Sequence, residues 1–248
     1  MAERWVEGTV TEKVEWTPQL FSLRVDAPVE EFEAGQFTKL GLEIDGELFG
    51  RPYSIVNPPE ARPLDFFFGL VARGHLSLAL ARLRAGNRVL VAPRASGFLT
   101  LSEVPGGREL WLLATGTGIG PFLSILRTEA PWKRFERVVL AHAVRTVAER
   151  AYVDVIEGVE RARAGQFVFV PFVSREATGY ALPGRIPPAI AEGRLEARAG
   201  LALDPDRSRV MLCGNPDMVR DACAALAARG FSKHRRREPG QILLENYW

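Results

Sequence analysis

The sequence predicts a two-domain fold in which an antiparallel β-barrel is followed by a doubly wound α/β domain with a parallel sheet. Two patterns support this: short runs of alternating apolar residues before residue 100, and nearly continuous apolar runs separated by helical patterns after residue 108. The first is typical of strands with one buried face, the second of parallel strands buried on both faces. Pro105-Gly106-Gly107 lies where the pattern changes, so we expect domains at 1–104 and 105–248.

In the first half, alternation places Val6, Gly8 and Val10 on one face of a strand. Similar runs predict further strands at 21–25, 40–44, 53–56, 64–72 and 90–92. One helix is expected at Ser77–Leu83, with Ser77 as its N-cap and Gly86 just beyond its end. Many short strands separated by turn residues indicate a small barrel.

In the second half, strands alternate with helices, which is the pattern of a doubly wound sheet. The apolar runs predict strands at 110–114, 138–144, 167–173 and 210–213. The helical patterns between and after them lie at 121–129, 148–163, 186–192 and 216–229.

Composition excludes several classes of protein. With 47% hydrophobic and 25% charged residues in 248, the chain has an ordinary globular composition rather than that of a disordered or coiled-coil protein. No apolar run has the roughly 20 residues of a membrane-spanning helix, and no secretory signal is visible, so we expect a cytoplasmic protein with no membrane partner. Two cysteines and three histidines make a protein-built metal site improbable, and we expect none.

Charge divides unevenly between the halves. Up to residue 104 there are 11 Lys and Arg against 14 Asp and Glu, a net −3; beyond it there are 21 against 16, a net +5, consistent with the total of +2. The C-terminal half therefore suits an anionic ligand or partner.

The segment Gly116-Thr117-Gly118-Ile119-Gly120-Pro121 follows a predicted strand and opens a predicted helix. Glycines there let the backbone approach a pyrophosphate, and the helix N-terminus offers free N–H groups. The spacing is G-x-G-x-G, not the usual G-x-G-x-x-G, so a tight turn without a ligand is the alternative.

Arginines follow two of the predicted parallel strands. Val144-Arg145 ends one and Val173-Ser174-Arg175 ends the next, while Arg185 lies further along. An NAD-binding unit places a carboxylate near the first of these positions, whereas guanidinium binds a 2′-phosphate bidentately. The pattern favours NADP(H) over NAD(H), with ordinary surface charges as the alternative.

The fourth parallel strand runs into Cys213-Gly214-Asn215-Pro216-Asp217. Asn215 or Gly214 can cap the following helix, with Pro216 at its first position. Cys213 then lies at the sheet edge near a bound nicotinamide, unless it is simply a small buried hydrophobe.

The barrel half has two candidate flavin segments. Arg51-Pro52-Tyr53-Ser54 supplies a cation for a pyrophosphate, an aromatic face and a hydroxyl, and residues 51 and 53 share a strand face. Pro52 cannot donate a ladder hydrogen bond, so it requires an edge strand or a bulge. Gly74-His75-Leu76-Ser77 opens a helix and offers a second anion site; plain barrel structure is the alternative for either segment.

Two features lie near the C-terminus. The terminal pair Tyr247-Trp248 either packs in a core or stacks on a cofactor ring. The cluster of Lys233, Arg235, Arg236 and Arg237 is either a solvated face or a docking site for an acidic protein. Near-neutral net charge and the lack of interleaved aromatics argue against nucleic acid.

Taken in order, these motifs resemble the ferredoxin/flavodoxin–NADP(+) reductases of the bacterial type over nearly the whole chain. The set comprises Arg-x-Tyr-Ser at 51–54, Gly-x-x-Ser at 74–77, the glycine-rich turn at 115–121, Val-Ser-Arg at 173–175, Cys-Gly-Asn-Pro at 213–216 and a terminal Tyr-Trp. The resemblance implies a barrel that binds FAD and an α/β domain that binds NADP(H).

The resemblance also implies roles for individual residues. Those toward FAD are Arg51, Pro52, Tyr53, Ser54, Phe67, His75, Leu76, Ser77, Thr117, Tyr247 and Trp248. The run Phe66-Phe67-Phe68 has no hydroxyl, whereas the resemblance implies a Tyr near FAD in this region. Those toward NADP are Val144, Arg145, Ser174, Arg175, Arg185, Asn215, Pro216 and Asp217.

The expected activity is hydride exchange between NADP(H) and FAD, coupled to one-electron exchange with ferredoxin or flavodoxin, an acidic protein docking near Lys233–Arg237. Ser54 and Cys213 are expected to border the hydride path, with Glu245 handling a proton. We expect a monomer. Two alternatives stay open: a flavin reductase or diaphorase with a small-molecule acceptor, and a non-catalytic flavoprotein subunit that passes electrons within a complex.

Overall fold

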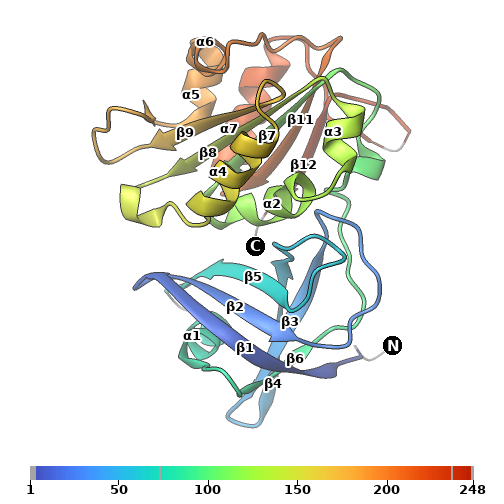
Figure 1. The fold of residues 1–248 in the computed structure, drawn as a ribbon, viewed down its shortest axis with the longest axis vertical. Helices are drawn as coiled ribbons and strands as arrows, with labels where there is room; N and C mark the ends of the chain where they lie inside the picture. Colours follow the sequence, from blue (N-terminus) through green and yellow to red (C-terminus); the bar gives the residue numbers. More distant parts are fainter. Residues whose placement is uncertain (1–3, 73, 236, 247–248) are drawn as a thin grey trace. The chain divides into compact units, whose positions relative to one another are not determined.

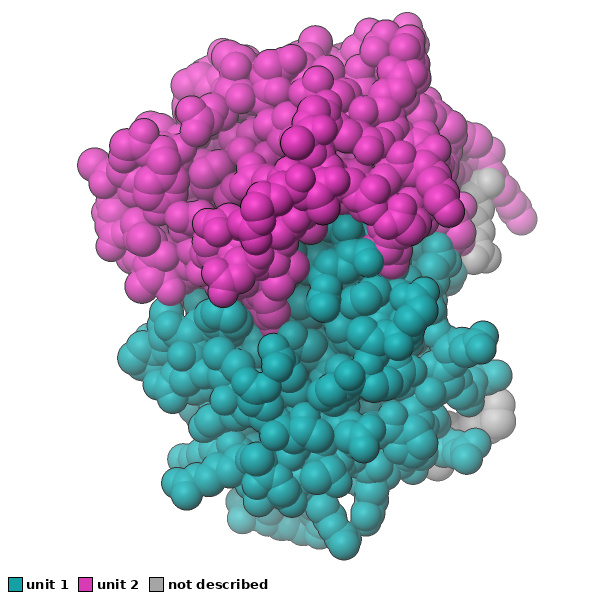
Figure 2. Space-filling view, in the orientation of Figure 1, with its two compact units in different colours: residues 1–100, 120–127 teal, residues 101–119, 128–248 magenta. Residues whose placement is uncertain are grey.

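The computed structural model describes residues 4–72, 74–235 and 237–246. Contacts between Cα atoms divide the chain into two units: unit 1 comprises Met1–Thr100 with Gly120–Arg127, and unit 2 comprises Leu101–Ile119 with Thr128–Trp248. Figure 2 colours the two units separately. The segment 120–127 therefore joins the barrel although it lies within the second half of the sequence.

Unit 1 is an antiparallel β-barrel that, among the described residues, also contains the helices α1 and α2 (Figure 1). In its described part the hydrogen-bonded order is β4-β3-β6-β1-β2-β5, and a bridge between Ile55 and Phe66 connects the chain beyond β4 to β5. Along these strands every second side chain points inward, and the inward apolar side chains form the core of the barrel. The elements are β1 (Val6–Thr17), β2 (Leu20–Asp26), β3 (Phe37–Ile44), β4 (Glu47–Ser54), β5 (Leu64–Gly69), α1 (His75–Arg82), β6 (Arg88–Val91) and α2 (Gly120–Leu126).

Unit 2 is a parallel sheet with helices on both faces, as predicted. Over the described residues its order is β10-β9-β8-β7-β11-β12, so the chain reverses direction across the sheet beside β7. The strands are β7 (Glu109–Thr115), β8 (Arg137–Val144), β9 (Phe167–Val173), β10 (Leu182–Pro183), β11 (Ser208–Gly214) and β12 (Ile242–Asn246). The helices are η1 (Leu101–Glu103), η2 (Gly116–Ile119), α3 (Ala130–Arg134), η3 (Val147–Glu149), α4 (Val153–Ala162), α5 (Ile186–Ala191), α6 (Arg194–Ala199) and α7 (Pro216–Ala227).

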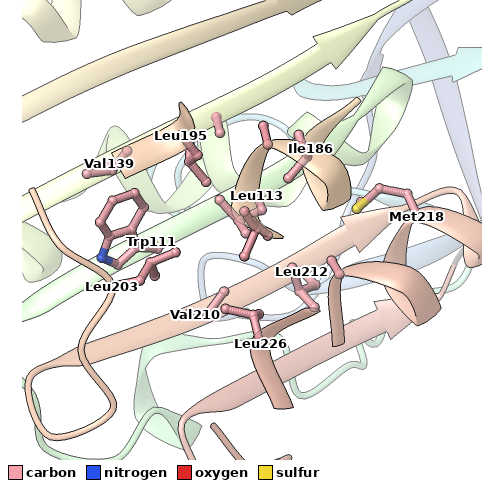
Figure 3. Close-up of a cluster of buried hydrophobic side chains, with 14 of the residues drawn as sticks. Trp111, Leu113, Val139, Ile186, Leu195, Leu203, Val210, Leu212, Met218 and Leu226 are labelled. Carbon is pink, nitrogen blue, oxygen red and sulfur yellow. The ribbon is translucent and has the colours of Figure 1, made fainter. Parts of the chain in front are cut away.

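One face of the parallel sheet packs on α5, α6 and α7 through a continuous apolar core (Figure 3). Trp111, Leu113 and Leu212 contribute from the strands, and Ile186 and Met218 from the helices. Because strand side chains alternate, the residues between these on β7 and β11 point to the other face. The sheet is therefore buried on both sides, which explains its nearly continuous apolar strands.

The structure corrects several boundaries. Helix α1 begins at His75 with Gly74 as its N-cap, so Ser77 lies inside the first turn and the prediction of Ser77 as N-cap is wrong. The Ser77 hydroxyl instead accepts a hydrogen bond from the Val71 N–H at 3.0 Å, which fixes the preceding loop.

The helix expected at 148–163 is shorter, because α4 begins at Val153. Its N-cap Tyr152 has a positive φ of 58°, which interrupts the helical path after η3. The chain also forms α6 and the outer strands β10 and β12, which were not predicted from the sequence. Of the described helices, none has the length and apolar character needed to cross a bilayer.

Candidate functional site

Strand β4 carries the Arg51-Pro52-Tyr53-Ser54 segment at one end of the barrel order, so the expectation that Pro52 requires an edge strand is confirmed. Arg51 is exposed and Tyr53 is half-buried, and the two flank Pro52 on the strand. The Tyr53 ring lies edge-on to the Phe68 ring, with 5.7 Å between the ring centroids. Burial raises the pKa of Tyr53 to about 12, against a smaller opposite effect of the Arg51 cation. Near neutral pH this site therefore presents a neutral phenol beside a guanidinium.

Ser54 ends β4 and is buried. A Cβ at Gly120, the first residue of α2, would lie 3.7 Å from the Ser54 Cβ and 3.4 Å from Val56 Cγ2. The Ser124 hydroxyl one turn later donates to the Asn57 carbonyl at 2.8 Å. The helix that follows the glycine-rich turn is thus packed against the end of the predicted flavin strand.

Helix α1 begins without a side-chain cap in the described chain. A Cβ at Gly74 would lie 2.8 Å from Val71 Cβ and 3.0 Å from Ser77 Oγ, so a larger residue does not fit there. Leu76 and Ser77 are buried, whereas His75 is exposed and stacks on the Phe49 ring at 5.7 Å. An anion at this turn would therefore meet backbone N–H groups rather than the side chains of Leu76 and Ser77.

Phe67 lies on β5, where alternation directs it away from the face that carries Phe66 and Phe68. It is buried, and its ring lies edge-on to Trp16 at 6.5 Å. The structure therefore does not bring Phe67 together with Tyr53, whose ring partner is Phe68.

In unit 2 the turns after β7 and β11 are in close backbone contact. A Cβ at Gly214, whose φ is +131°, would lie 2.3 Å from Thr115 Oγ1. A Cβ at Gly118 would lie 2.6 Å from the Cys213 carbonyl oxygen. The Asn215 N–H donates to Thr115 Oγ1 at 2.9 Å. Glycine is required at both positions, and the two turns form one structure at the point where strand order reverses, the usual position of ligands in open α/β sheets.

A buried histidine that the sequence analysis missed supports the same turn. His142 on β8 makes a 2.9 Å hydrogen bond from Nε2 to the carbonyl of Gly116. Burial lowers the pKa of His142 to about 4, so the ring is neutral at physiological pH. Since a carbonyl oxygen only accepts, the neutral ring carries its proton on Nε2. A lone histidine within an apolar strand gave no sign of this role.

Cys213 is fully buried, and Glu245 is its partner in the parallel register of β11 and β12. Ala114 and His142 occupy the same row across β7 and β8, so these four side chains point to one face of the sheet. Burial raises the pKa of Glu245 to about 7. A carboxyl with this pKa exchanges a proton near neutral pH.

Asn215 caps α7: its side-chain oxygen accepts from the N–H groups of Asp217 at 2.8 Å and Met218 at 3.3 Å. Pro216 occupies the first turn, as predicted. Asp217 is exposed and pairs with Arg220 at 2.6 Å, so its carboxylate balances a cation at the helix start.

The predicted arginines follow adjacent strands. The N–H of Arg175 donates to the Arg145 carbonyl at 2.8 Å, and the Ser174 N–H donates to the Val144 carbonyl at 3.1 Å, so the ends of β8 and β9 are connected. The Arg175 and Arg185 side chains are exposed, and Arg185 is the N-cap residue of α5 after Gly184 with its φ of +90°. Arg145 pairs with Glu149, which the sequence analysis also missed.

Thr117 is half-buried within η2. In the basic cluster, Lys233, Arg235 and Arg237 are exposed, and Arg235 pairs with Glu238 at 3.3 Å. Tyr247, Trp248 and Arg236 lie outside the described residues. The described residues contain no group of three or more His, Cys, Asp or Glu arranged to hold a metal ion.

Comparison with known proteins identifies the family. The chain is 48% identical over 245 residues to the flavodoxin/ferredoxin–NADP reductases of Shigella flexneri and Escherichia coli (strain K12), an alignment covering 98% of this chain and 99% of each relative. The chain belongs to the flavodoxin/ferredoxin–NADP reductase family. The resemblance predicted from its motifs is thereby confirmed.

Further comparisons agree with membership in the reductase family. The family model described as the oxidoreductase NAD-binding domain matches residues 112–224. The crystal structure of a ferredoxin NADP+ reductase from Neisseria gonorrhoeae with bound FAD and NADP matches with a TM-score of 0.92 and 34% identity, covering 99% of both chains. The predicted order of an antiparallel barrel and a doubly wound domain is confirmed.

Proposed function

We propose that this chain is an oxidoreductase that exchanges a hydride with NADP(H) and single electrons with ferredoxin or flavodoxin, using bound FAD. The observation that carries the proposal is the 48% identity to flavodoxin/ferredoxin–NADP reductases across nearly the full length, which includes both units.

Unit 1 has the groups that FAD requires. The aromatic Tyr53 and cationic Arg51 share one face of β4, and the uncapped start of α1 offers N–H groups to a phosphate. When bound there, FAD would supply the chemistry that converts a two-electron transfer into single-electron transfers. Tyr53 provides a ring face for the isoalloxazine, Arg51 a charge for the pyrophosphate, and Ser54 a hydroxyl at the strand end.

Unit 2 has the groups that NADP(H) requires. The turns after β7 and β11 pack directly on each other at Gly118 and Gly214. We assign Thr117 and Asn215 to Asp217, which belong to these turns, to the nucleotide. We assign recognition of the 2′-phosphate to Arg145, Arg175 and Arg185, with Val144 and Ser174 beside them. Their exposed or half-exposed guanidinium groups suit a doubly charged phosphate monoester.

Proton and hydride movement is assigned to the strand ends. On the family resemblance we assign Ser54 and Cys213 to the hydride path, and Glu245 as the proton carrier because its pKa lies near 7. Tyr247 and Trp248 are assigned to covering FAD until nicotinamide binds, an assignment that rests on the family resemblance alone.

The acidic partner is assigned to the basic cluster of Lys233, Arg235, Arg236 and Arg237. Charged surfaces raise association rates more than they stabilise complexes, and salt screens them. The kcat/KM for flavodoxin should therefore fall steeply between low and physiological salt, and charge-removing variants at Lys233 and Arg237 should flatten this dependence. If kcat/KM of the unmodified protein did not change with salt, the cluster would be an ordinary solvated surface and not a docking site. We further propose a cytoplasmic monomer, since a low cysteine content suits a reducing compartment.

The experiment that tests this function compares electron acceptors. The purified chain with FAD is given NADPH and either a purified flavodoxin or ferredoxin, or a small-molecule acceptor such as free flavin. The proposal expects efficient reduction of the protein acceptor by the chain alone. Turnover only with the small molecule would favour a diaphorase, and failure to oxidise NADPH unaided would favour an electron-transfer subunit.

A further inference from the structure

Arg145, the residue that ends β8, is held by a carboxylate four residues later. One oxygen of Glu149 lies 2.6 Å from Arg145 Nη2 and 2.7 Å from Nε. The other oxygen accepts the Arg145 backbone N–H at 2.9 Å. The Glu149 side chain is only 14% exposed, whereas that of Arg145 is 50% exposed, so the carboxylate is fixed in the protein and the guanidinium extends from it.

The ion pair uses one edge of the guanidinium. The Nε–H and one Nη2–H point in the same direction, and both meet Glu149. The two N–H groups of Nη1 and the second of Nη2 lie on the remaining edges. A planar group with five donors can therefore bind Glu149 and a phosphate at the same time.

Neighbouring backbone contacts fix the loop that carries this pair. The Arg145 carbonyl accepts the Arg175 N–H at 2.8 Å. At the start of η3, the Val147 N–H donates to the Glu176 carboxylate at 2.6 Å. The backbone of Arg145 is thus tied on both sides, and the ion pair with Glu149 selects the side-chain rotamer.

We infer that Glu149 is a positioning residue for recognition of the 2′-phosphate: it fixes Arg145 by one edge, so that the opposite edge is presented to a phosphate monoester. The inference rests on the proposed assignment of Arg145 to the 2′-phosphate. An unrestrained arginine loses rotamer freedom on binding, and Glu149 removes that loss in advance. If instead the Glu149 charge mainly repelled the phosphate, removing that charge would tighten phosphate binding rather than weaken it.

The test measures binding of two ligands that differ only in the 2′-phosphate, adenosine 2′,5′-bisphosphate and 5′-AMP, by calorimetry on the FAD-containing protein. Glu149→Gln keeps the size of the side chain and Glu149→Ala removes it. We expect each to raise the Kd of the bisphosphate by about 5- to 10-fold, within the range set by arginine rotamer entropy, and to change the Kd of 5′-AMP by less than about 2-fold, since that ligand lacks the group Arg145 meets.

Glu157→Gln is the matched control, because Glu157 pairs with Arg161 at the same spacing on the exposed surface of α4, with N and O 3.8 Å apart. It should leave both Kd values unchanged. Thermal unfolding of each variant checks that the fold is retained.

Arg145→Ala separates failure of the inference from failure of the assignment beneath it. If Arg145→Ala weakens the bisphosphate selectively but the Glu149 variants weaken both ligands equally, Glu149 is merely structural and the inference fails alone. Tighter bisphosphate binding by Glu149→Gln would also overturn the inference, because it would make Glu149 a competitor. If Arg145→Ala leaves the ratio of the two Kd values unchanged, the assignment of Arg145 falls, and the inference falls with it.

Discussion

The buried His142 allows a prediction with a defined sign and size. Its pKa of about 4 in the folded chain lies below the ordinary 6.5, because burial removes the hydration that a charged ring needs. Each pKa unit corresponds to 1.36 kcal/mol, so the difference contributes about 3 kcal/mol of stability. Because the folded pKa is lowered, this contribution is fully present above pH 6.5 and is lost as the pH falls from 6.5 through 4.

NMR of the imidazole nitrogens measures this directly, with His142→Leu used to assign the signal. We expect the His142 ring to be neutral, protonated on Nε2 and without titration down to about pH 5. The difference in free energy of unfolding between the natural chain and His142→Leu should fall by about 3 kcal/mol between pH 7 and pH 4, with the sign given above. A titration midpoint near 6.5, or a proton on Nδ1, would refute the reasoning, since Nε2 could not then donate to Gly116 from a neutral ring.

Three other predictions concern Gly214, Glu245 and Trp248. Gly214→Ala places a Cβ 2.3 Å from Thr115 Oγ1 at a φ of +131°, so it should cost about 2–4 kcal/mol in unfolding experiments and weaken NADP(H) binding; Gly165→Ala, with a φ of +84° but open space, should cost only about 1 kcal/mol. Glu245 has a folded pKa of about 7, so its contribution to stability is complete below pH 4.5 and is lost as the pH rises through 7. Glu245→Gln should remove this pH dependence of the free energy of unfolding and any step near pH 7 in the rate of flavodoxin reduction. An unchanged pH profile of that rate would exclude Glu245 as the proton carrier. Deleting Trp248 should change both NADP(H) affinity and the rate of hydride transfer in stopped-flow measurements, whereas no change in either would remove the covering role.

Sequence reasoning succeeded where a local pattern determines the structure. Strand β9 begins and ends where its apolar run does, and Asn215 caps α7 because its side chain bonds the N–H groups of the next turn, an interaction within three residues. The sequence pattern also predicted Arg145 and Arg175 at the ends of adjacent strands, because the carboxyl ends of parallel strands lie at the same edge of a sheet.

It failed where a distant contact decides. Strand β12 forms because 242–246 pairs with β11, about 30 residues earlier in the chain, a partner that no local periodicity reveals. The apolar spacing before α4 did not show that Tyr152 adopts a positive φ. Glu149 could have been found, because an acid four residues after a strand-end arginine is a recognisable pairing signal. His142 could not, because a single histidine among apolar residues usually indicates a core position.

The central claim is that this chain holds FAD in the barrel unit and takes its electrons from NADPH. The most direct measurement is an absorbance titration of the purified chain with FAD, followed by anaerobic addition of NADPH or NADH. We expect close to one FAD per chain and bleaching of the flavin band by NADPH at concentrations far below those needed for NADH. A colourless chain that binds no FAD on reconstitution, or equal bleaching by the two nucleotides, would contradict it.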